Sequence, residues 1–465
     1  MTVAEATPDL EQVDRNDRAF LGHPKGLGYL GFTEGCERFS YYSMQTLLVL
    51  YMVNYLLVPG RMEKVIGLEW LQAHVYHGIS GQPLASAIFG TYTSLVYGTP
   101  ILGGIIADKW LGRDKTLILG GILMAIGHFL MAIESAFVFA LLALLLGVGA
   151  FKGNIATQVG ALYRQNDLRR AMAFQIFYIF INVSVIVAPL ISGTLGQKVG
   201  WHYGFGCAGV VMVLGLIIYL SGRRYLPAEE LVAPSEEPAL REPLTRDDWM
   251  CVLYLIILIP VMAVSLLTNQ QIFNAYLTWG DQHFDLTLLN NTSSWLITVD
   301  AAVSFTMLVA VAAFWKWYGT RGREPDEITK IIIGSIFTVA GGLCLFMAAL
   351  TQPPGGKISL FWPMMFELCN SIGFAHVLPI SLALFSKIAP KQITATVIGL
   401  YYLSFFIANA VVGYVGGLYS SLPTTTFWLI HVASAAFGLV AFAVFKIVLG
   451  KRMTSGAKEQ AAALS

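Results

Sequence analysis

Long apolar segments recur along the whole chain and are separated by short polar stretches. About 20 apolar residues are enough to cross the hydrocarbon core of a bilayer as a helix. Segments of this kind lie at residues 30–58, 84–107, 116–135, 137–162, 171–195, 202–221, 249–276, 293–317, 328–350, 359–386, 393–418 and 424–449. The pattern therefore predicts an all-α membrane protein with about twelve transmembrane helices.

The composition supports a membrane protein, because 56% of the 465 residues are hydrophobic and only 12% are charged. Soluble domains carry about twice that share of charged residues. Of the 29 lysines and arginines, about 23 fall on the side shared by both termini and about 4 on the opposite side. The positive-inside rule therefore places both termini in the cytoplasm.

The net charge of +1 gives no reason to expect a nucleic-acid partner, since the basic residues are spread over short loops. The five cysteines lie in or beside apolar segments without metal-ligand spacing, so neither a disulfide nor a metal site is expected. The first twenty residues are polar and acidic and do not resemble a cleaved signal. No nucleophile with a base and no phosphate loop is found, and the sequence predicts neither an enzyme nor a cofactor.

The longest hydrophilic interruption divides the chain into two halves. Residues 222–248 contain four prolines, two adjacent arginines and a cluster of glutamates, a composition typical of a flexible linker. We therefore expect a six-helix bundle at 1–221, a cytoplasmic linker at 222–248, a second six-helix bundle at 249–452 and a cytoplasmic tail at 453–465. Two parallel halves of this kind indicate a transporter that alternates by rocking.

The first apolar segment carries three charged residues, Glu34, Glu37 and Arg38. A charge at the centre of a membrane helix costs about 2.5 to 3.5 kcal/mol on insertion scales. The spacing places all three on one helix face, where two neighbouring carboxylates repel each other unless a proton or a cation compensates. Lys152 is the other cation that lies well inside an apolar segment, away from its ends. The alternative is a purely architectural ion pair that braces two helices.

The loop after the second apolar segment reads GGIIADKWLGRDK, from Gly103 to Lys115. It resembles the signature of the major facilitator superfamily, G-x-x-x-D-K-x-x-G-R-x-K, which begins here at Gly104. A tight glycine turn would let Asp108 and Arg113 pair with each other or with helix ends, and so gate the cytoplasmic side. The alternative is that these charges only orient the loop.

The stretch EGCERFSYY at residues 34–42 resembles the hallmark of the proton-dependent oligopeptide transporter family. Further matches are FKGN at 151–154, FYIFIN ending at Asn182, Pro379, and IAP at 388–390. The resemblance implies the major facilitator fold, with twelve helices in two bundles. It also implies a proton-coupled symporter that imports di- and tripeptides, with protons as the coupling ion and no other cofactor. We expect a monomer embedded in lipid of a bacterial inner membrane.

The resemblance assigns roles to individual residues. Proton coupling falls to Glu34, Glu37, Arg38 and Lys152. Substrate binding falls to Tyr41, Tyr42, Gln45, Tyr97, Lys152, Asn182, Gln270, Asp300 and Phe374. The ammonium of Lys152 is suited to the terminal carboxylate of a peptide. For each tyrosine, interhelical packing with a satisfied hydroxyl is an equally good interpretation.

Three positions depart from the family pattern by losing a charge. Gln45 stands where the family often has an arginine, Gln270 where it often has a glutamate, and Phe374 where it has an inner-gate glutamate. Two amides can still hydrogen-bond, but they do not attract each other as charges do. The cargo is therefore open to alternatives: nitrate, another organic anion or a modified amino acid. A peptide sensor that binds without transport is a second alternative.

Two further acids lie in the second half of the chain. Asp300 occupies a position where the family usually has an asparagine, and an acid there is suited to a terminal amine or a proton. Glu367 lies seven residues before Phe374 and is a candidate substitute for the missing glutamate. His376 is interpreted as a packed residue rather than a proton site.

Overall fold

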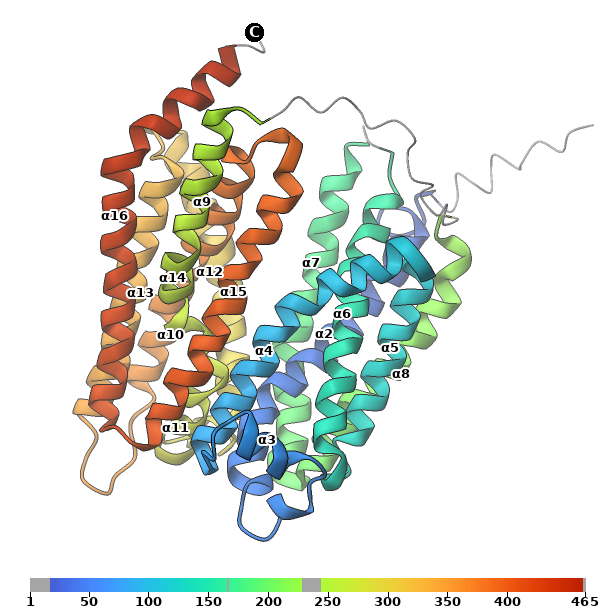
Figure 1. The fold of residues 1–465 in the computed structure, drawn as a ribbon, viewed down its shortest axis with the longest axis vertical. Coiled ribbons are helices and arrows are strands. Elements are labelled where there is room, and N and C mark those ends of the chain that lie inside the picture. Colours follow the sequence, from blue (N-terminus) through green and yellow to red (C-terminus); the bar gives the residue numbers. More distant parts are fainter. Residues whose placement is uncertain (1–16, 165–166, 228–243, 463–465) are drawn as a thin grey trace, which may run out of the picture. The chain divides into compact units, whose positions relative to one another are not determined.

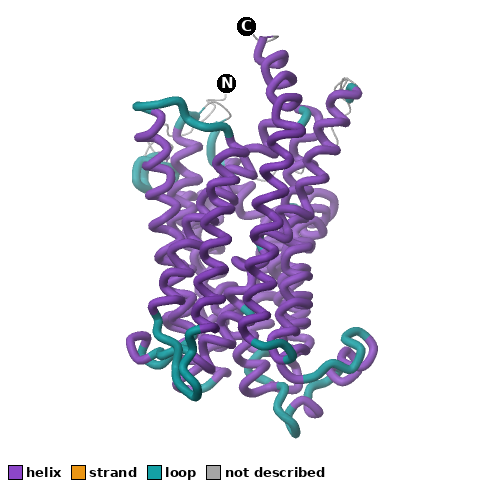
Figure 2. Tube along the Cα trace, turned by 90° about the vertical axis from the view of Figure 1, so that its left-hand side faces the viewer, coloured by secondary structure: helices purple, strands orange, loops and turns teal. Residues whose placement is uncertain are grey.

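The computed structural model describes residues 17–164, 167–227 and 244–462. Within these residues the chain is helical, with two isolated β-bridges and no strand (Figure 2). The prediction of an all-α protein is therefore confirmed. Most of the expected linker at 222–248, the start of the chain and the last residues of the expected tail at 453–465 lie outside the described residues.

Figure 1 labels the helices. Their bounds coincide closely with the apolar segments of the sequence. Those of the first half are α2 (Lys25–Tyr51), α3 (Leu68–His74), α4 (Gly81–Ile106), α5 (Arg113–Leu130), α6 (Phe137–Ala161), α7 (Arg169–Ala188) and α8 (Trp201–Gly222). Those of the second half are α9 (Arg246–Ser265), α10 (Leu267–Gln270), α11 (Ala275–His283), α12 (Ser294–Gly319), α13 (Glu327–Leu350), α14 (Phe361–Ile388), α15 (Thr394–Gly417) and α16 (Thr424–Ala462).

In the described part of the chain, nine helices are long and apolar enough to cross a membrane. The helices α2, α4 and α5 are not among them. For two of them the reason is visible in the sequence, since α2 carries buried charges and α5 begins with Arg113, Asp114 and Lys115. The protein is an integral membrane protein, and the total of twelve crossings stays a prediction.

Two compact units are found in the chain. The first comprises Met1–Leu47 with Thr99–Pro234, and the second comprises Leu48–Gly98 with Ser235–Ser465. The first unit thus holds most of α2, the end of α4 and α5 to α8. The second holds α9 to α16 together with the segment from the end of α2 to the middle of α4. The expected bundles at 1–221 and 249–452 stay a prediction.

Within each unit the helices pack through their small and apolar faces. In the first unit α5 packs against α6 and α8; in the second, α13 packs against α14 and α16, α12 against α14, and α9 against α15 and α16. The backbones of α4 and α6 approach so closely that a Cβ on Gly103 would lie 2.0 Å from the carbonyl oxygen of Gly149. Small residues at such crossings are typical of membrane helices.

The apolar segment at 249–276 is not one continuous helix, contrary to the expectation. α9 ends at Ser265, and at Asn274 the backbone leaves the helical region with φ −121° and ψ −104°. The fully buried amide of Asn274 donates to the carbonyl of Val412 over 3.3 Å and accepts from the hydroxyl of Ser86 over 2.9 Å. These bonds come from α15 and α4, and they stabilise the break.

Candidate functional site

The charged residues of α2 form a compact buried cluster in the first unit. Glu34, Glu37 and Arg38 are 4%, 0% and 5% exposed. The Nε of Arg38 lies 3.0 Å from Oε1 of Glu34 and 2.5 Å from Oε2 of Glu37. One guanidinium therefore faces two carboxylates. Helical spacing accounts for the position of Glu34, since Glu37 and Arg38 lie three and four residues after it and so on its side of the helix.

The hydrogen bonding of this cluster is incomplete. Oε2 of Glu34, Oε1 of Glu37 and Nη2 of Arg38 are buried without a hydrogen-bond partner. Ionised groups that leave water without full pairing are costly. Because two carboxylates share one guanidinium, the cluster retains acceptor atoms at which a proton can bind.

Lys152 and the two tyrosines lie beside these charges. The aromatic ring of Tyr41 has the guanidinium carbon of Arg38 at 5.2 Å and the ammonium of Lys152 at 6.0 Å from its centroid. Tyr42 packs edge-on against Tyr41, with ring centroids 5.1 Å apart. Lys152 on α6 also interacts electrostatically with Glu34 and Glu37. The structure thus brings the four expected coupling residues together with Tyr41 and Tyr42.

Two other expected substrate residues belong to the same unit. Gln45 lies two turns after Arg38 on α2, is 6% exposed, and has a buried Oε1 without a hydrogen-bond partner. Asn182 on α7 donates its amide to the carbonyl of Tyr178, one turn earlier on its own helix, over 2.8 Å. Their roles in substrate binding stay predictions.

Tyr97, Gln270 and Phe374 belong to the second unit. The ring of Tyr97 stacks on Phe405 with centroids 5.2 Å apart. The Oε1 of Gln270 accepts from the amide of Asn409 over 3.4 Å, and Phe374 is half-buried on α14. The stacking of Tyr97 fits the packing interpretation of that tyrosine at least as well as a substrate contact.

His376 is engaged on both ring nitrogens. Its Nε2 accepts from the indole nitrogen of Trp315 over 3.1 Å, and its Nδ1 lies 2.8 Å from the carbonyl of Ile372. A ring that accepts at Nε2 and donates at Nδ1 is neutral. This geometry agrees with the interpretation of His376 as a packed residue.

Asp300 and Glu367 are brought together by the structure, although the sequence pointed to each of them separately. Asp300 on α12 and Glu367 on α14 lie close enough to interact electrostatically. The hydroxyl of Tyr276 on α11 lies beside Glu367. Tyr276 was missed from the sequence, because nothing in a tyrosine on an apolar segment separates a site residue from a packed one.

The loop between α4 and α5 contains an ion pair between Asp108 and Arg113, with 3.7 Å between the closest atoms. The side chain of Asp108 is 67% exposed. Asp114, which follows Arg113, is better buried than Asp108. It accepts a hydrogen bond from the hydroxyl of Tyr219 over 2.8 Å and lies 2.5 Å from Nη2 of Arg223. Sequence analysis overlooked Asp114, and the gating role of Asp108 and Arg113 stays a prediction.

These two acids give a paired prediction. Asp114→Asn is expected to destabilise the protein by about 1 to 3 kcal/mol, because it weakens bonds made by a mostly buried carboxylate. Asp108→Asn is expected to change stability by less than about 0.5 kcal/mol, because exposed ion pairs contribute little. The measurement is the thermal unfolding midpoint of each purified variant in detergent. Equal midpoints would show that the bonds of Asp114 do not stabilise the first unit.

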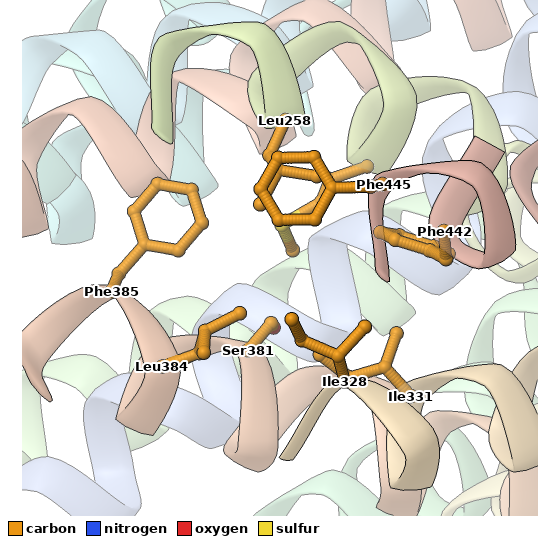
Figure 3. Close-up of a pocket in the computed structure, with 9 residues that line it drawn as sticks. Leu258, Ile328, Ile331, Ser381, Leu384, Phe385, Phe442 and Phe445 are labelled. Carbon is orange, nitrogen blue, oxygen red and sulfur yellow. The ribbon is translucent and has the colours of Figure 1, made fainter. Parts of the chain in front are cut away.

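A small apolar pocket lies among α9, α13, α14 and α16 in the second unit (Figure 3). Its lining consists of Leu258, Met262, Ile328, Ile331, Ser381, Leu384, Phe385, Phe442 and Phe445. The only hydroxyl among these, that of Ser381, donates to the carbonyl of Leu378 over 3.0 Å. The lining offers no charged partner, so we interpret this pocket as a packing gap and not as a site for a charged substrate.

Comparison with known proteins identifies the class. The family profile described as Major Facilitator Superfamily matches residues 36–413. The chain therefore belongs to the major facilitator superfamily, a family of transporters rather than enzymes, as the sequence predicted.

Individual relatives narrow the relationship. The peptide transporter YePEPT of Yersinia enterocolitica is 28% identical, over 86% of this chain and 89% of the relative. A di-/tripeptide transporter of Lactococcus lactis is 27% identical, over 95% and 99%. The crystal structure of a peptide transporter POT in complex with sulfate matches with a TM-score of 0.78 and 25% identity, over 96% and 99%. The predicted relationship to the proton-dependent oligopeptide transporters is confirmed.

Proposed function

We propose that this protein imports di- and tripeptides together with protons by alternating access. The observation that carries the proposal is the buried cluster of Glu34, Glu37 and Arg38 beside Lys152. The relative from Lactococcus lactis is named a di-/tripeptide transporter, and a related peptide transporter was crystallised in complex with alafosfalin. We further propose a monomer in a bacterial inner membrane with both termini in the cytoplasm.

Coupling follows from the competition for two cations. When both glutamates are ionised, they hold Arg38 and attract Lys152. A proton on Glu34 or Glu37 removes one of the two negative charges and weakens that attraction. The ammonium of Lys152 is then available to a peptide carboxylate. Substrate and proton binding thereby favour each other. The driving force is about 2.3 kcal/mol per charge for each 100 mV of membrane potential.

A carrier of another anion is the second candidate, and the neutral side chains of Gln45, Gln270 and Phe374 favour it. The family often has charged side chains at these positions, and neutral ones offer no ion pair to the two charged ends of a zwitterionic peptide. A binding site for nitrate, another organic anion or a modified amino acid would need fewer charged side chains than a binding site for a peptide.

The test is uptake of labelled dipeptide into liposomes that contain the purified protein. With an inwardly directed proton gradient, we expect accumulation above the external concentration, and collapse of that accumulation by a protonophore. Labelled nitrate is the matched comparison and is expected to stay at equilibrium. Accumulation of nitrate but not of peptide would establish the second candidate. Peptide binding without exchange of labelled for unlabelled peptide would identify a sensor.

A further inference from the structure

We propose that Asp300 and Glu367 form a second proton-binding site, in the second unit, where two carboxyl groups share one proton beside the hydroxyl of Tyr276. A role of this site in transport depends on the proposed symport. Its ability to bind a proton is argued from its geometry alone.

Glu367 is fully buried and Asp300 is partly buried, with its Oδ1 shielded from solvent, and the two acids face each other from two helices. Glu367 is 0% exposed, and neither of its carboxylate oxygens has a hydrogen-bond partner. One helical turn further along each helix, the hydroxyls of Ser304 and Ser371 lie 2.9 Å apart. Asp300 also interacts with Ser304 on its own helix. The polar residues of α12 and α14 therefore face each other at two successive levels, which fixes the two carboxyl groups side by side.

No cation in the described part of the chain compensates these acids. Among the described residues, no lysine or arginine interacts electrostatically with either Asp300 or Glu367. This distinguishes the pair from the cluster on α2, where Arg38 bridges two glutamates. Two ionised carboxylates accept hydrogen bonds but donate none. Their contact therefore becomes a hydrogen bond only when one of them carries a proton, and burial favours that neutral form.

Tyr276 is the third member of the site. It is 0% exposed, and its hydroxyl lies beside Glu367 from a third helix, α11. The hydroxyl has no hydrogen-bond partner in the described part of the structure. A phenol that comes to donate to a neighbouring carboxylate stabilises the ionised form of that carboxylate. Tyr276 and Asp300 thus act on the proton of Glu367 in opposite directions, since Asp300 adds negative charge.

Several other titratable side chains of the neighbouring helices have partners elsewhere. His376 on α14 accepts from Trp315, and Cys344 on α13 contacts Cys369 of α14. On α15, the hydroxyl of Tyr401 donates to the carbonyl of Leu378 over 3.1 Å. The three side chains on α11, α12 and α14 therefore define the site.

The test is an infrared titration of the full-length protein in liposomes, which follows the C=O stretching band of protonated carboxyl groups. Spectra of the double variant Asp300→Asn/Glu367→Gln are subtracted from those of the unmodified protein. We expect a protonated carboxyl band in the difference at neutral pH. The glutamates of α2 contribute equally to both samples and cancel. Asp285→Asn, which removes an exposed acid of the same unit, is expected to leave the spectrum unchanged.

Two single variants are expected to shift the pH at which the band disappears in opposite directions. In Asp300→Asn the neighbouring charge is gone and an amide can donate to Glu367, so the band is expected to disappear about one pH unit lower. In Tyr276→Phe a donor to the ionised form is gone, so the band is expected to persist to higher pH. A role limited to packing would not move the two titrations apart.

Two outcomes would overturn the proposal: a difference spectrum without the band, or shifts of the same sign in the two single variants. If Asp300→Asn does not fold, Tyr276→Phe, which keeps the ring, still decides the direction. The titration requires no peptide. A protein that shows the band but no peptide uptake would contradict the symport alone, and one that takes up peptide without the band would contradict the acid pair alone.

Discussion

Glu37→Gln is expected to lower proton-driven accumulation of labelled dipeptide at least about tenfold. The variant removes a carboxylate that binds the proton and, when ionised, attracts the cations of the cluster. Lys152→Ala is expected to have an equally large effect on accumulation. The reason differs, since that variant removes the ammonium that we assign to the peptide carboxylate. Initial rates of uptake into liposomes at a fixed inward proton gradient measure both effects.

Counterflow separates the two roles. Exchange of labelled for unlabelled peptide needs substrate binding and alternation but no net proton movement. We therefore expect Glu37→Gln to retain exchange and Lys152→Ala to lose it. The controls are Glu63→Gln and Lys64→Ala, the same changes at exposed neighbouring residues in the loop after α2. Undiminished accumulation in either site variant would remove that residue from the coupling scheme.

The parts of this site that lie on one helix could be predicted from the sequence. Glu37 and Arg38 lie three and four residues after Glu34, so helical periodicity alone places each of them beside Glu34. The contact with Lys152 depends on how α6 packs beside α2, and its prediction required the family resemblance. Most helix ends could also be predicted, because polar loops interrupt the apolar segments sharply.

Contacts between distant segments could not be predicted in the same way. Asp300 and Glu367 are far apart in sequence, and their meeting depends on the rotation of α12 and α14 about their own axes. The break at Asn274 depends on bonds from α4 and α15. Local propensity carries no information about such partners. A search for polar residues at i and i+4 on two apolar helices would have found the pairs Asp300 with Ser304 and Glu367 with Ser371.

The superfamily signature does not include the glycine at which α4 and α6 approach each other closely. It begins at Gly104, where an added Cβ would meet nothing within 4 Å. The close approach lies at Gly103, where a Cβ would be 2.0 Å from the carbonyl oxygen of Gly149 and 2.9 Å from the Cα of Ala150. Both neighbours are backbone atoms, so neither can move aside as a side chain can.

Gly103→Ala is therefore expected to destabilise the protein by about 3 kcal/mol or more, at or above the upper end of ordinary overpacking, because α4 and α6 must separate. Gly104→Ala is expected to be neutral or to stabilise by up to about 1 kcal/mol, since alanine favours the helix and meets no obstacle. Thermal unfolding midpoints of the two variants in detergent measure this difference. A lower midpoint for Gly104→Ala than for Gly103→Ala would contradict the close crossing of α4 and α6, and with it the packing that holds α6, the helix of Lys152, in the first unit.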